Sequence, residues 1–396
     1  MEKVVLAYSG GLDTSYCVKY LIHEKQLEVH TILVNTGGFS EKELEETAQK
    51  AYELGSSSHS NKTILDTFYN KAIKYLIFGN VLKNNTYPLS VSAERIFQAI
   101  EVIKYAKEIG ANYIAHGSTG AGNDQIRFDV IFQTLAPEIN IITPIRDLQL
   151  SRQEEVSYLE KHGVNYSWEK AQYSINKGIW GTSVGGKETL TSHQSLPESA
   201  YPSQLENKEE TTITLHFDQG ELIGLDNVKD TPISNIKKLE QLASSYAIGR
   251  DIHVGDTIIG IKGRVGFEAA APLLIIKAHH LLEKHVLTKW QQYWKEQLAN
   301  WYGMLLHEGN YLDPVMRNIE VFLEDSQKTV TGDVIVRLKP YHFVLEGVAS
   351  DFDLMKSDFG QYGEMNNEWT SEDAKGFIKI YGNANKIYHQ INSSLV

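Results

Sequence analysis

The chain contains very little cysteine, with Cys17 as the single thiol in 396 residues. One thiol cannot form an internal disulfide or supply a multi-cysteine zinc site. Long hydrophobic runs are also missing, since no stretch approaches the roughly 18 to 20 apolar residues of a membrane span. The short apolar run within residues 1–8 is too brief for the core of a signal peptide. We therefore expect a cytoplasmic protein.

Positive charge is scarce as well. The 38 lysines and arginines are outnumbered by 50 aspartates and glutamates, which gives a formal net charge of −12. Such an acidic chain repels the phosphate backbone of nucleic acids. We therefore expect neither a nucleic-acid nor a membrane partner, although one local pocket can still bind a nucleotide. The hydrophobic fraction of 42% and the length predict a globular protein of two or three domains.

The first 160 residues or so alternate between predicted strands and helices. A strand that is apolar on both faces is expected at 3–8, and further strands at 29–34, 113–115 and 139–142. Helices are expected at 41–54 and 92–110, and another directly after the first strand. The polar stretch GSSSHSNK, residues 55–62, is expected to form a loop. This order predicts an α/β fold with a doubly wound parallel sheet, in which ligands bind beyond the carboxyl ends of the strands.

The pattern changes after about residue 165. Alternating apolar residues at 212–225 and 332–347 predict antiparallel hairpins, so the second half is expected to be α+β. Between them, residues 288–306 place Trp290, Trp294 and Trp301 at helical spacing, which indicates a core or a subunit interface. The last segment, 374–396, is expected to be a strand-like piece followed by a short polar end.

A glycine-rich stretch, AYSGGLDTSY at residues 7–16, follows the first predicted strand. Backbone N–H groups at a helix start bind anions, and adjacent glycines let phosphate oxygens approach the backbone. Ser9, Thr14 and Ser15 add hydroxyl donors. The stretch lacks the Gly-Lys-Ser/Thr ending of a Walker A loop and the Gly-x-Gly-x-x-Gly fingerprint. The stretch therefore predicts a phosphate site of another type than these two motifs. The structural alternative is a glycine turn followed by a capped helix.

A second glycine-rich loop, HGSTGAGNDQIRFD at residues 116–129, follows the strand expected at 113–115. Its glycines allow close approach of the backbone, and its polar side chains are Thr119, Asn123, Asp124 and Arg127. Hydroxyl, amide and guanidinium donors suit substrate carboxylates, and a carboxylate suits a substrate amine. The alternative is a solvated polar loop. His116 fits a structural role as well as it fits a ligand contact.

These two stretches carry a resemblance to a known family. SGGLDTS resembles the pyrophosphate loop of the N-type ATP pyrophosphatases, and the second loop resembles HGxTGxGNDQxRF, the signature of the argininosuccinate synthase family. Other matching segments are TYPLSVSAER (86–95), YSINKGIWGTS (173–183), GIKGR (260–264) and YLDPVMRNIEVFLEDSQKTVTG (311–332). The resemblance covers nearly the whole chain.

The resemblance implies an ATP-dependent carbon–nitrogen ligase of arginine biosynthesis. In that reaction the ureido oxygen of citrulline attacks the α-phosphate of magnesium ATP, and the α-amine of aspartate then displaces AMP from the citrullyl-adenylate. Such chemistry rests on positioning and on stabilising charge at phosphate. The resemblance also implies a homotetramer, an ATP-binding domain at 1–165, a synthetase and multimerisation domain at 166–370, and a C-terminal segment at 371–396.

Roles for single residues follow from the same resemblance. The implied ATP-binding residues are Ala7, Tyr8, Ser9, Gly10, Gly11, Leu12, Asp13, Thr14, Ser15, Val34 and Gly117. The aspartate-binding residues are Thr119, Asn123 and Asp124. The citrulline-binding residues are Tyr87, Ser92, Asn123, Arg127, Ser174 and Ser183. Asp13, Asp124 and Arg127 are the expected catalytic residues, and no protein ligand to a metal is expected. His279, His280 and His285 are interpreted as helix surface or core.

The chain departs from the family pattern at several positions. Gly255 and Phe267 stand where the family usually has a glutamate and a tyrosine that contact citrulline, and Asn176 and Gly185 replace usual acidic residues. Losing a charge-assisted hydrogen bond costs about 1.5–3 kcal/mol. Ordinary citrulline, anchored by other groups or partly by the neighbouring Asp256, is the favoured substrate, and an N-acylated citrulline is the alternative.

Two other classes are open at this point. A tRNA-modifying enzyme of the same loop superfamily predicts a basic surface and often catalytic cysteines, which the charge of −12 and the single Cys17 oppose. The second class is a binding or sensor protein without catalytic activity. In such a protein the phosphate loop is expected to be degraded, whereas residues 9–15 are intact.

Overall fold

The computed structural model describes residues 1–166, 173–360, 362–364 and 368–393. The chain forms two compact units, Met1–Phe352 and Asp353–Val396. The predicted domain boundaries at 165 and 370 remain predictions. In the described part of the chain, no helix is both long and apolar enough to cross a membrane.

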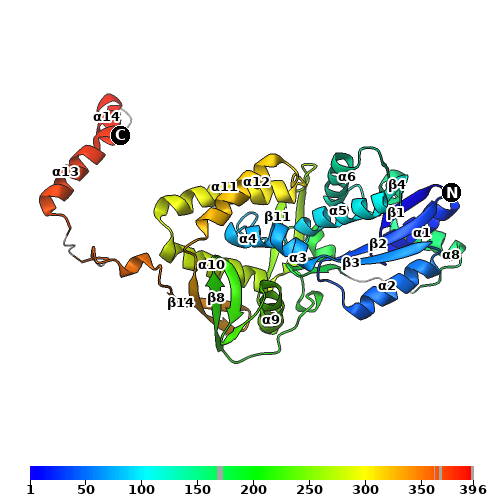
Figure 1. Cartoon of the computed structure of the whole chain (residues 1–396), viewed down its shortest axis with the longest axis horizontal. Helices are drawn as coiled ribbons and strands as arrows, with labels where there is room; N and C mark the ends of the chain where they lie inside the picture. The colour runs from blue at the N-terminus through cyan, green and yellow to red at the C-terminus, as the bar shows by residue number, and fades with distance from the viewer. Residues whose placement is uncertain (167–172, 361, 365–367, 394–396) are drawn as a thin grey trace. The chain divides into compact units, whose positions relative to one another are not determined.

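A five-stranded parallel sheet forms the amino-terminal part of the first unit (Figure 1). Its strands are β1 (Lys3–Ala7), β2 (Glu28–Asn35), β3 (Ser58–Thr63), β4 (Tyr113–His116) and β5 (Asn140–Ile142). They lie in the order β3-β2-β1-β4-β5, and each neighbouring pair is parallel. The predicted α/β class with a parallel sheet is therefore confirmed.

The expectation of a loop at 55–62 is wrong for residues 58–62. Residues 58–63 form β3, which pairs with β2 from His30 opposite Ser58 to Asn35 opposite Thr63. This strand lies at the sheet edge and leaves its polar side chains half-buried or exposed. A polar edge strand is held by backbone hydrogen bonds and lacks the apolar pattern of the central strands.

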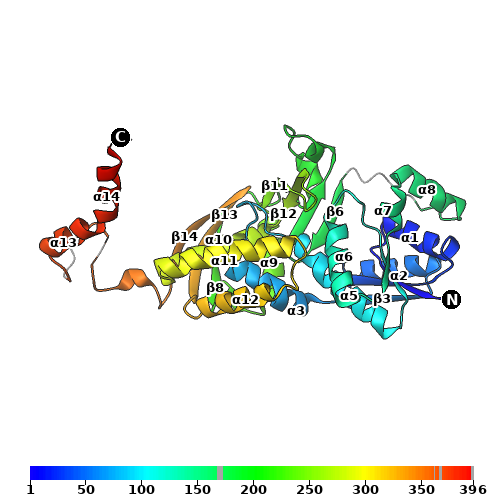
Figure 2. The ribbon, with the colours of Figure 1, turned by 90° about the horizontal axis from the view of Figure 1, so that it is seen from above.

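Helices cover both faces of the parallel sheet (Figures 1 and 2). Val4 and Leu6 pack in one core with α1 (Leu12–His23), α2 (Glu41–Glu53) and α8 (Arg152–Lys161). Val5 packs in the other core with α5 (Ser92–Glu108) and α6 (Asp124–Leu135). The short α7 (Pro144–Leu148) follows β5. Alternate side chains of β1 are thus buried on opposite faces, as the apolar run predicts.

The remaining elements of the first unit build the α+β part. A four-stranded antiparallel sheet has the order β11-β12-β7-β6, from β6 (Ser174–Gly178), β7 (Gly181–Gly185), β11 (Arg250–Asp256) and β12 (Lys262–Glu268). A five-stranded sheet has the order β10-β9-β8-β13-β14, from β8 (Thr211–Asp218), β9 (Glu221–Leu225), β10 (Val228–Lys229), β13 (Gly332–Lys339) and β14 (His342–Ala349). These pairings confirm the predicted antiparallel hairpins.

The helices of this part are α3 (Leu65–Phe68), α4 (Lys74–Phe78), α9 (Pro232–Ser244), α10 (Ala270–Val286), α11 (Lys289–His307) and α12 (Pro314–Ser326). A π-helical turn, Tyr69–Ile73, joins α3 to α4. Short 3-10 turns lie at Lys187–Leu190, Glu198–Ala200 and Leu354–Lys356.

The tryptophans of α11 do not lie in the core of the chain. Trp290, Trp294 and Trp301 are more than half exposed, at 63%, 58% and 57%. The core interpretation is therefore wrong for these three residues, because the helix buries another face. An interface role remains a prediction.

The C-terminal unit is helical, so the expected strand-like piece is wrong. It contains α13 (Ser371–Tyr381) and α14 (Asn383–Ile391). Thr370 accepts a hydrogen bond from the backbone N–H of Asp373 and donates to the Asp373 carboxylate, which fixes the start of α13. No described residue of either helix is buried.

Candidate active site

A cavity of about 1110 Å³ opens at the carboxyl ends of β1, β2 and β4. Its other walls come from the starts of α5 and α6, from the four-stranded sheet, and from His307 at the end of α11. All predicted site residues line this cavity except Gly10 and Ser15. Gly10 faces Thr47, and the Ser15 side chain is buried. The structure thus gathers the two glycine-rich loops and the predicted substrate residues in one place.

The first loop joins β1 directly to α1. Gly10 has φ +76°, in the left-handed region that favours glycine, and Gly11 precedes the first turn of the helix. The hydroxyl groups of Ser9 and Thr14 lie 3.3 Å apart, and Lys50 Nζ donates to the Gly10 carbonyl oxygen at 2.6 Å. The loop therefore brings a helix amino terminus and two hydroxyls to one end of the cavity, which suits phosphate.

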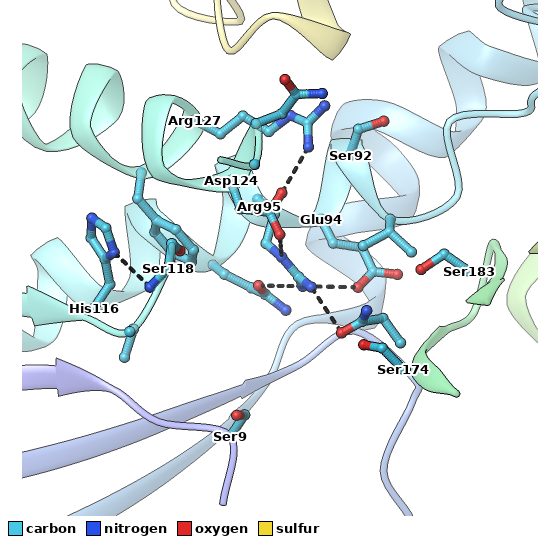
Figure 3. A pocket seen from close by; sticks show the side chains of 18 of the residues that line it. Ser9, Ser92, Glu94, Arg95, His116, Ser118, Asp124, Arg127, Ser174 and Ser183 are labelled. Atoms are coloured by element: carbon cyan, nitrogen blue, oxygen red, sulfur yellow. Dashed lines mark hydrogen bonds and ion pairs between the residues drawn. The ribbon is translucent and has the colours of Figure 1, made fainter. Parts of the chain in front are cut away.

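The second loop joins β4 to α6, where the Gln125 side chain donates to two loop carbonyl oxygens, those of Gly120 and Gly122. His116 at the end of β4 hydrogen-bonds Asp129 at 2.9 Å. It also accepts from the Ser118 backbone N–H at 3.2 Å (Figure 3). Thr119, Asn123 and Asp124 are left facing the cavity.

Three charged side chains, Arg95, Asp124 and Arg127, form a connected row across the cavity between α5 and α6 (Figure 3). We call this row the charged chain. The Asp124 carboxylate lies 2.9 Å from Arg95 Nε and 2.7 Å from Arg127 Nη1. Burial alone would raise the pKa of Asp124, but the two guanidinium groups lower it to about 2. The carboxylate is therefore ionised at neutral pH and fixes two cations beside the cavity.

The guanidinium of Arg127 is held from α11 as well. Its Nε donates to the His307 carbonyl oxygen at 2.8 Å, and its Nη2 lies 3.2 Å from His307 Nδ1. The pKa of His307 is lowered to about 2 by burial and then by Arg127, so the imidazole is neutral and accepts from the guanidinium. Arg127 is 4% exposed and is oriented before any ligand binds.

The predicted citrulline residues come from three elements. Ser174 and Ser183 lie on neighbouring strands β6 and β7, and Ser92 starts α5. The Tyr87 hydroxyl accepts hydrogen bonds from Ser90 and from the backbone N–H of Val91. All four predicted residues line the cavity, and their roles remain predictions.

Reasoning from the sequence missed several groups that line the cavity, including Glu94, Arg95, His253 and His307. Arg95 lies three residues after Ser92 on one helix, so its place on the same face could have been inferred from helical spacing. The two histidines lie on β11 and α11, and no local motif marks them.

Glu94 is a buried carboxyl group in the wall of this cavity. It is 2% exposed, and its Oε2 accepts from the Thr36 hydroxyl at 2.8 Å. Its Oε1 has no hydrogen-bond partner among the described residues. A Cβ atom at residue 178 would lie 1.6 Å from Oε1, which explains the glycine there. Burial raises the pKa of Glu94 to about 8 against the opposing effect of Arg95.

This raised pKa predicts a pH-dependent stability. Between about pH 4.5 and 8 the folded chain holds a proton on Glu94 that the unfolded chain has lost, so the contribution of Glu94 to stability falls as pH rises. In Glu94→Gln this titration is absent. We expect the free energy of unfolding of Glu94→Gln, relative to the parent, to increase by about 1.4 kcal/mol per pH unit in this window.

Urea unfolding of both proteins at pH 5.5 and 7.5 measures this difference. Glu46→Gln, an exposed carboxylate on α2, serves as the control and should show no such trend. If the difference in free energy of unfolding between Glu94→Gln and the parent does not change with pH, the raised pKa of Glu94 is refuted.

Within the described residues, no cluster of three or more His, Cys, Asp or Glu could hold a metal ion.

The chain matches two family descriptions over almost its whole length. Residues 3–165 match the arginosuccinate synthase N-terminal HUP domain, and residues 173–388 match the arginosuccinate synthase C-terminal domain. The chain belongs to the argininosuccinate synthase family. The predicted family and its carbon–nitrogen ligase function in arginine biosynthesis are thereby confirmed.

Curated relatives agree with this assignment. The argininosuccinate synthase of Dictyoglomus turgidum is 37% identical over 389 residues, covering 98% of this chain and 97% of that protein. That of Xanthomonas campestris is 35% identical over 403 residues, covering 99% of both chains. That of Methanocaldococcus jannaschii is 34% identical over 386 residues, covering 96% of this chain and 97% of that protein.

Proposed function

We propose that the cavity joins citrulline to aspartate with ATP in two steps. First the ureido oxygen attacks the α-phosphorus, the bond between the α-phosphorus and its bridging oxygen breaks, and pyrophosphate leaves. The aspartate α-amine then attacks the ureido carbon, the carbon–oxygen bond breaks, and AMP leaves with the ureido oxygen while the amine gives up a proton. The juxtaposition of the two glycine-rich loops with the Arg95–Asp124–Arg127 chain supports this proposal most strongly.

In this proposal the first loop binds the triphosphate. Backbone N–H groups at the start of α1 and the hydroxyls of Ser9 and Thr14 would contact phosphate oxygens. Magnesium would bind to those oxygens and offset their charge. Gly117 would lie under the nucleotide, next to Asp13 and Thr14.

The two amino acids would lie beyond the triphosphate. Thr119, Asn123 and Asp124 would hold aspartate, and Tyr87, Ser92, Arg127, Ser174 and Ser183 would hold citrulline, with Asn123 between them. Asp13, Asp124 and Arg127 would be the catalytic residues, through charge and orientation. Because the reaction consumes ATP, we place it in the cytoplasm.

The proposed function predicts that pyrophosphate forms only when magnesium ATP, aspartate and a citrulline substrate are all present. Gly117→Val should lower kcat/KM for ATP at least about tenfold, since its methyl groups extend from a Cβ that already lies 3.4 Å from Asp13 and Thr14. Pyrophosphate release coupled to a colorimetric phosphate assay measures both effects.

Gly347→Val is the matched control, because a Cβ at this residue of β14 meets nothing within 4 Å. Pyrophosphate release that needs no amino acid, or an unchanged Gly117→Val enzyme, would contradict the proposal.

We propose further that the chain forms a homotetramer that uses its C-terminal unit. The described residues of α13 and α14 leave many apolar side chains exposed, among them Phe377, Ile380, Tyr381, Ile387 and Tyr388. Exposed apolar surface of this kind marks a protein interface. A chain that lacks residues 353–396 should therefore form assemblies of fewer than four chains, with a molar mass below four times that of the truncated chain.

Light scattering during gel filtration measures the mass. A chain shortened only after Asn392 keeps α14 and should remain tetrameric. A monomeric full-length chain, or a truncated chain that is still tetrameric, would contradict this proposal.

A further inference from the structure

One wall of the cavity is formed by the β11–β12 hairpin. His253 stands opposite Val265 and Gly255 opposite Gly263, and these four residues share one face because strand side chains alternate. All four line the cavity. Asp256 also lines the cavity, but it stands opposite Lys262 and forms an ion pair with it at 2.7 Å. Its carboxylate is therefore already paired.

This wall borders the proposed citrulline site. The His253 ring stacks on Tyr87 with 5.2 Å between centroids, and Phe267 of the same hairpin pairs with Ser183 on β7. The ureido oxygen of citrulline has to reach the α-phosphate at the first loop. In the proposed function the α-carbon end of the substrate would therefore lie away from that loop, toward Tyr87 and the hairpin.

The imidazole of His253 occupies the space that a side chain at residue 255 would need. A Cβ on Gly255 would lie 2.7 Å from His253 Nε2 and 3.2 Å from Asn84 Nδ2. His253 is 6% exposed, and its Nδ1 has no hydrogen-bond partner among the described residues. Gly263, opposite Gly255, leaves open space, since a Cβ there would meet only Thr257 Cγ2, at 3.6 Å.

A free ammonium group would find little to stabilise it here. Of the acidic residues lining the cavity, Asp124 holds two arginines, Glu43 caps α2 with Ser40, Glu94 accepts from Thr36, and Asp256 pairs with Lys262. Asp13 lies at the first loop, at the phosphate end. No carboxylate among the described residues of the hairpin is therefore both on the cavity face and free of an ion pair.

Two cations, Lys83 and Arg127, act on the imidazoles near this wall. The pKa of His253 is lowered by burial and by Lys83, and that of His307 by burial, Arg127 and Lys83. Burial is the larger cause of both shifts, and the same cations also disfavour a substrate ammonium. A neutral imidazole can donate to a carbonyl oxygen or accept from an amide N–H.

Resting on the proposed function, we propose that this enzyme takes citrulline whose α-nitrogen carries an acyl group in preference to free citrulline. The amide is uncharged, its N–H or carbonyl oxygen would pair with His253, and the acyl group would occupy the space at Gly263. Apolar Phe267, fully buried and 5.4 Å from Tyr87 between ring centroids, offers no polar group to an ammonium. The acyl group takes no part in the bonds that form or break.

The test compares citrulline, N-acetylcitrulline and N-succinylcitrulline with the full-length enzyme, magnesium ATP and aspartate. We expect kcat/KM for one acylated form to exceed that for citrulline by about tenfold to a hundredfold, the effect of one charge-assisted contact. The better acylated form identifies the acyl class. Equal or higher kcat/KM for free citrulline would overturn this inference and leave the proposed function intact. No pyrophosphate from any of the three would overturn both.

A variant pair tests whether the wall itself sets this preference. His253→Ala with Gly255→Glu makes room for a carboxylate and should shift the ratio of kcat/KM toward free citrulline by about tenfold. Gly347→Glu on β14 is the control and should leave the ratio unchanged. A double variant with the parent's ratio would overturn the role of the wall, because a purely structural change alters both substrates alike.

Discussion

Asp124→Asn is expected to lower kcat/KM for pyrophosphate formation by about 30- to 300-fold. Removing one charge of a hydrogen-bonded pair costs about 2–5 kcal/mol, much of it from the partner left unpaired. Asp124 has two partners, Arg95 at 2.9 Å and Arg127 at 2.7 Å. Its own side chain is 36% exposed, so solvent screening favours the lower part of that range, about 2–3.5 kcal/mol.

Steady-state kinetics with each substrate varied in turn measures this loss. Because the pKa of Asp124 is held near 2, the ratio between parent and variant should stay constant from pH 6 to 9. Asp325→Asn, an exposed carboxylate on α12, is the control and should behave as the parent. An Asp124→Asn enzyme within threefold of the parent would show that the charged chain does not support catalysis.

Lys295→Met is expected to reduce the free energy of unfolding by about 3–5 kcal/mol, the cost of leaving a buried charge without its partner. Lys295 Nζ lies 2.7 Å from Glu283 Oε2 and donates to the Phe78 carbonyl oxygen at 2.8 Å. Both charged side chains are essentially without solvent exposure, at 1% and 0%. Glu283 also accepts from Asn80 and Gln327, so the loss would spread through a buried network.

Urea unfolding followed by circular dichroism measures this cost. Lys284→Met removes an exposed lysine from α10 and is the matched control. Adding Glu283→Gln to Lys295→Met removes the unpaired charge and should restore part of the stability. A Lys295→Met protein within 1 kcal/mol of the parent would mean that the pair is not a stabilising element.

The sequence predicted the parallel sheet because strands and helices alternate and the first strand is apolar on both faces. It predicted the site because glycines and polar residues follow β1 and β4. It failed at β3, where an edge strand carries the polar stretch 58–63. Whether such a segment forms a strand depends on backbone pairing with a neighbouring strand that is distant in sequence.

The buried face of α11 was mistaken for a related reason. Lys295, Ala299, Tyr302 and Leu306 follow helical spacing and are all buried. Lys295 interrupts the apolar pattern of this buried face, because a lysine is buried here only through its ion pair with Glu283 of α10. The more conspicuous tryptophans were therefore assigned to a core or a subunit interface, and more than half of each is exposed.

Long-range packing also explains the site residues that the sequence did not reveal. Arg127 was found from its motif, but its orientation depends on His307, 180 residues later. His253 is placed by the pairing of β11 with β12 and by Tyr87. No local pattern contains this information.

The central claim, that the ureido oxygen attacks the α-phosphorus of ATP, has a direct test. The enzyme is supplied with magnesium ATP, aspartate and its preferred citrulline substrate labelled with ¹⁸O in the ureido group, and the products are analysed by mass spectrometry. The account predicts that the label appears in the phosphate of AMP and that pyrophosphate stays unlabelled. Label in pyrophosphate, or unlabelled AMP, would contradict it.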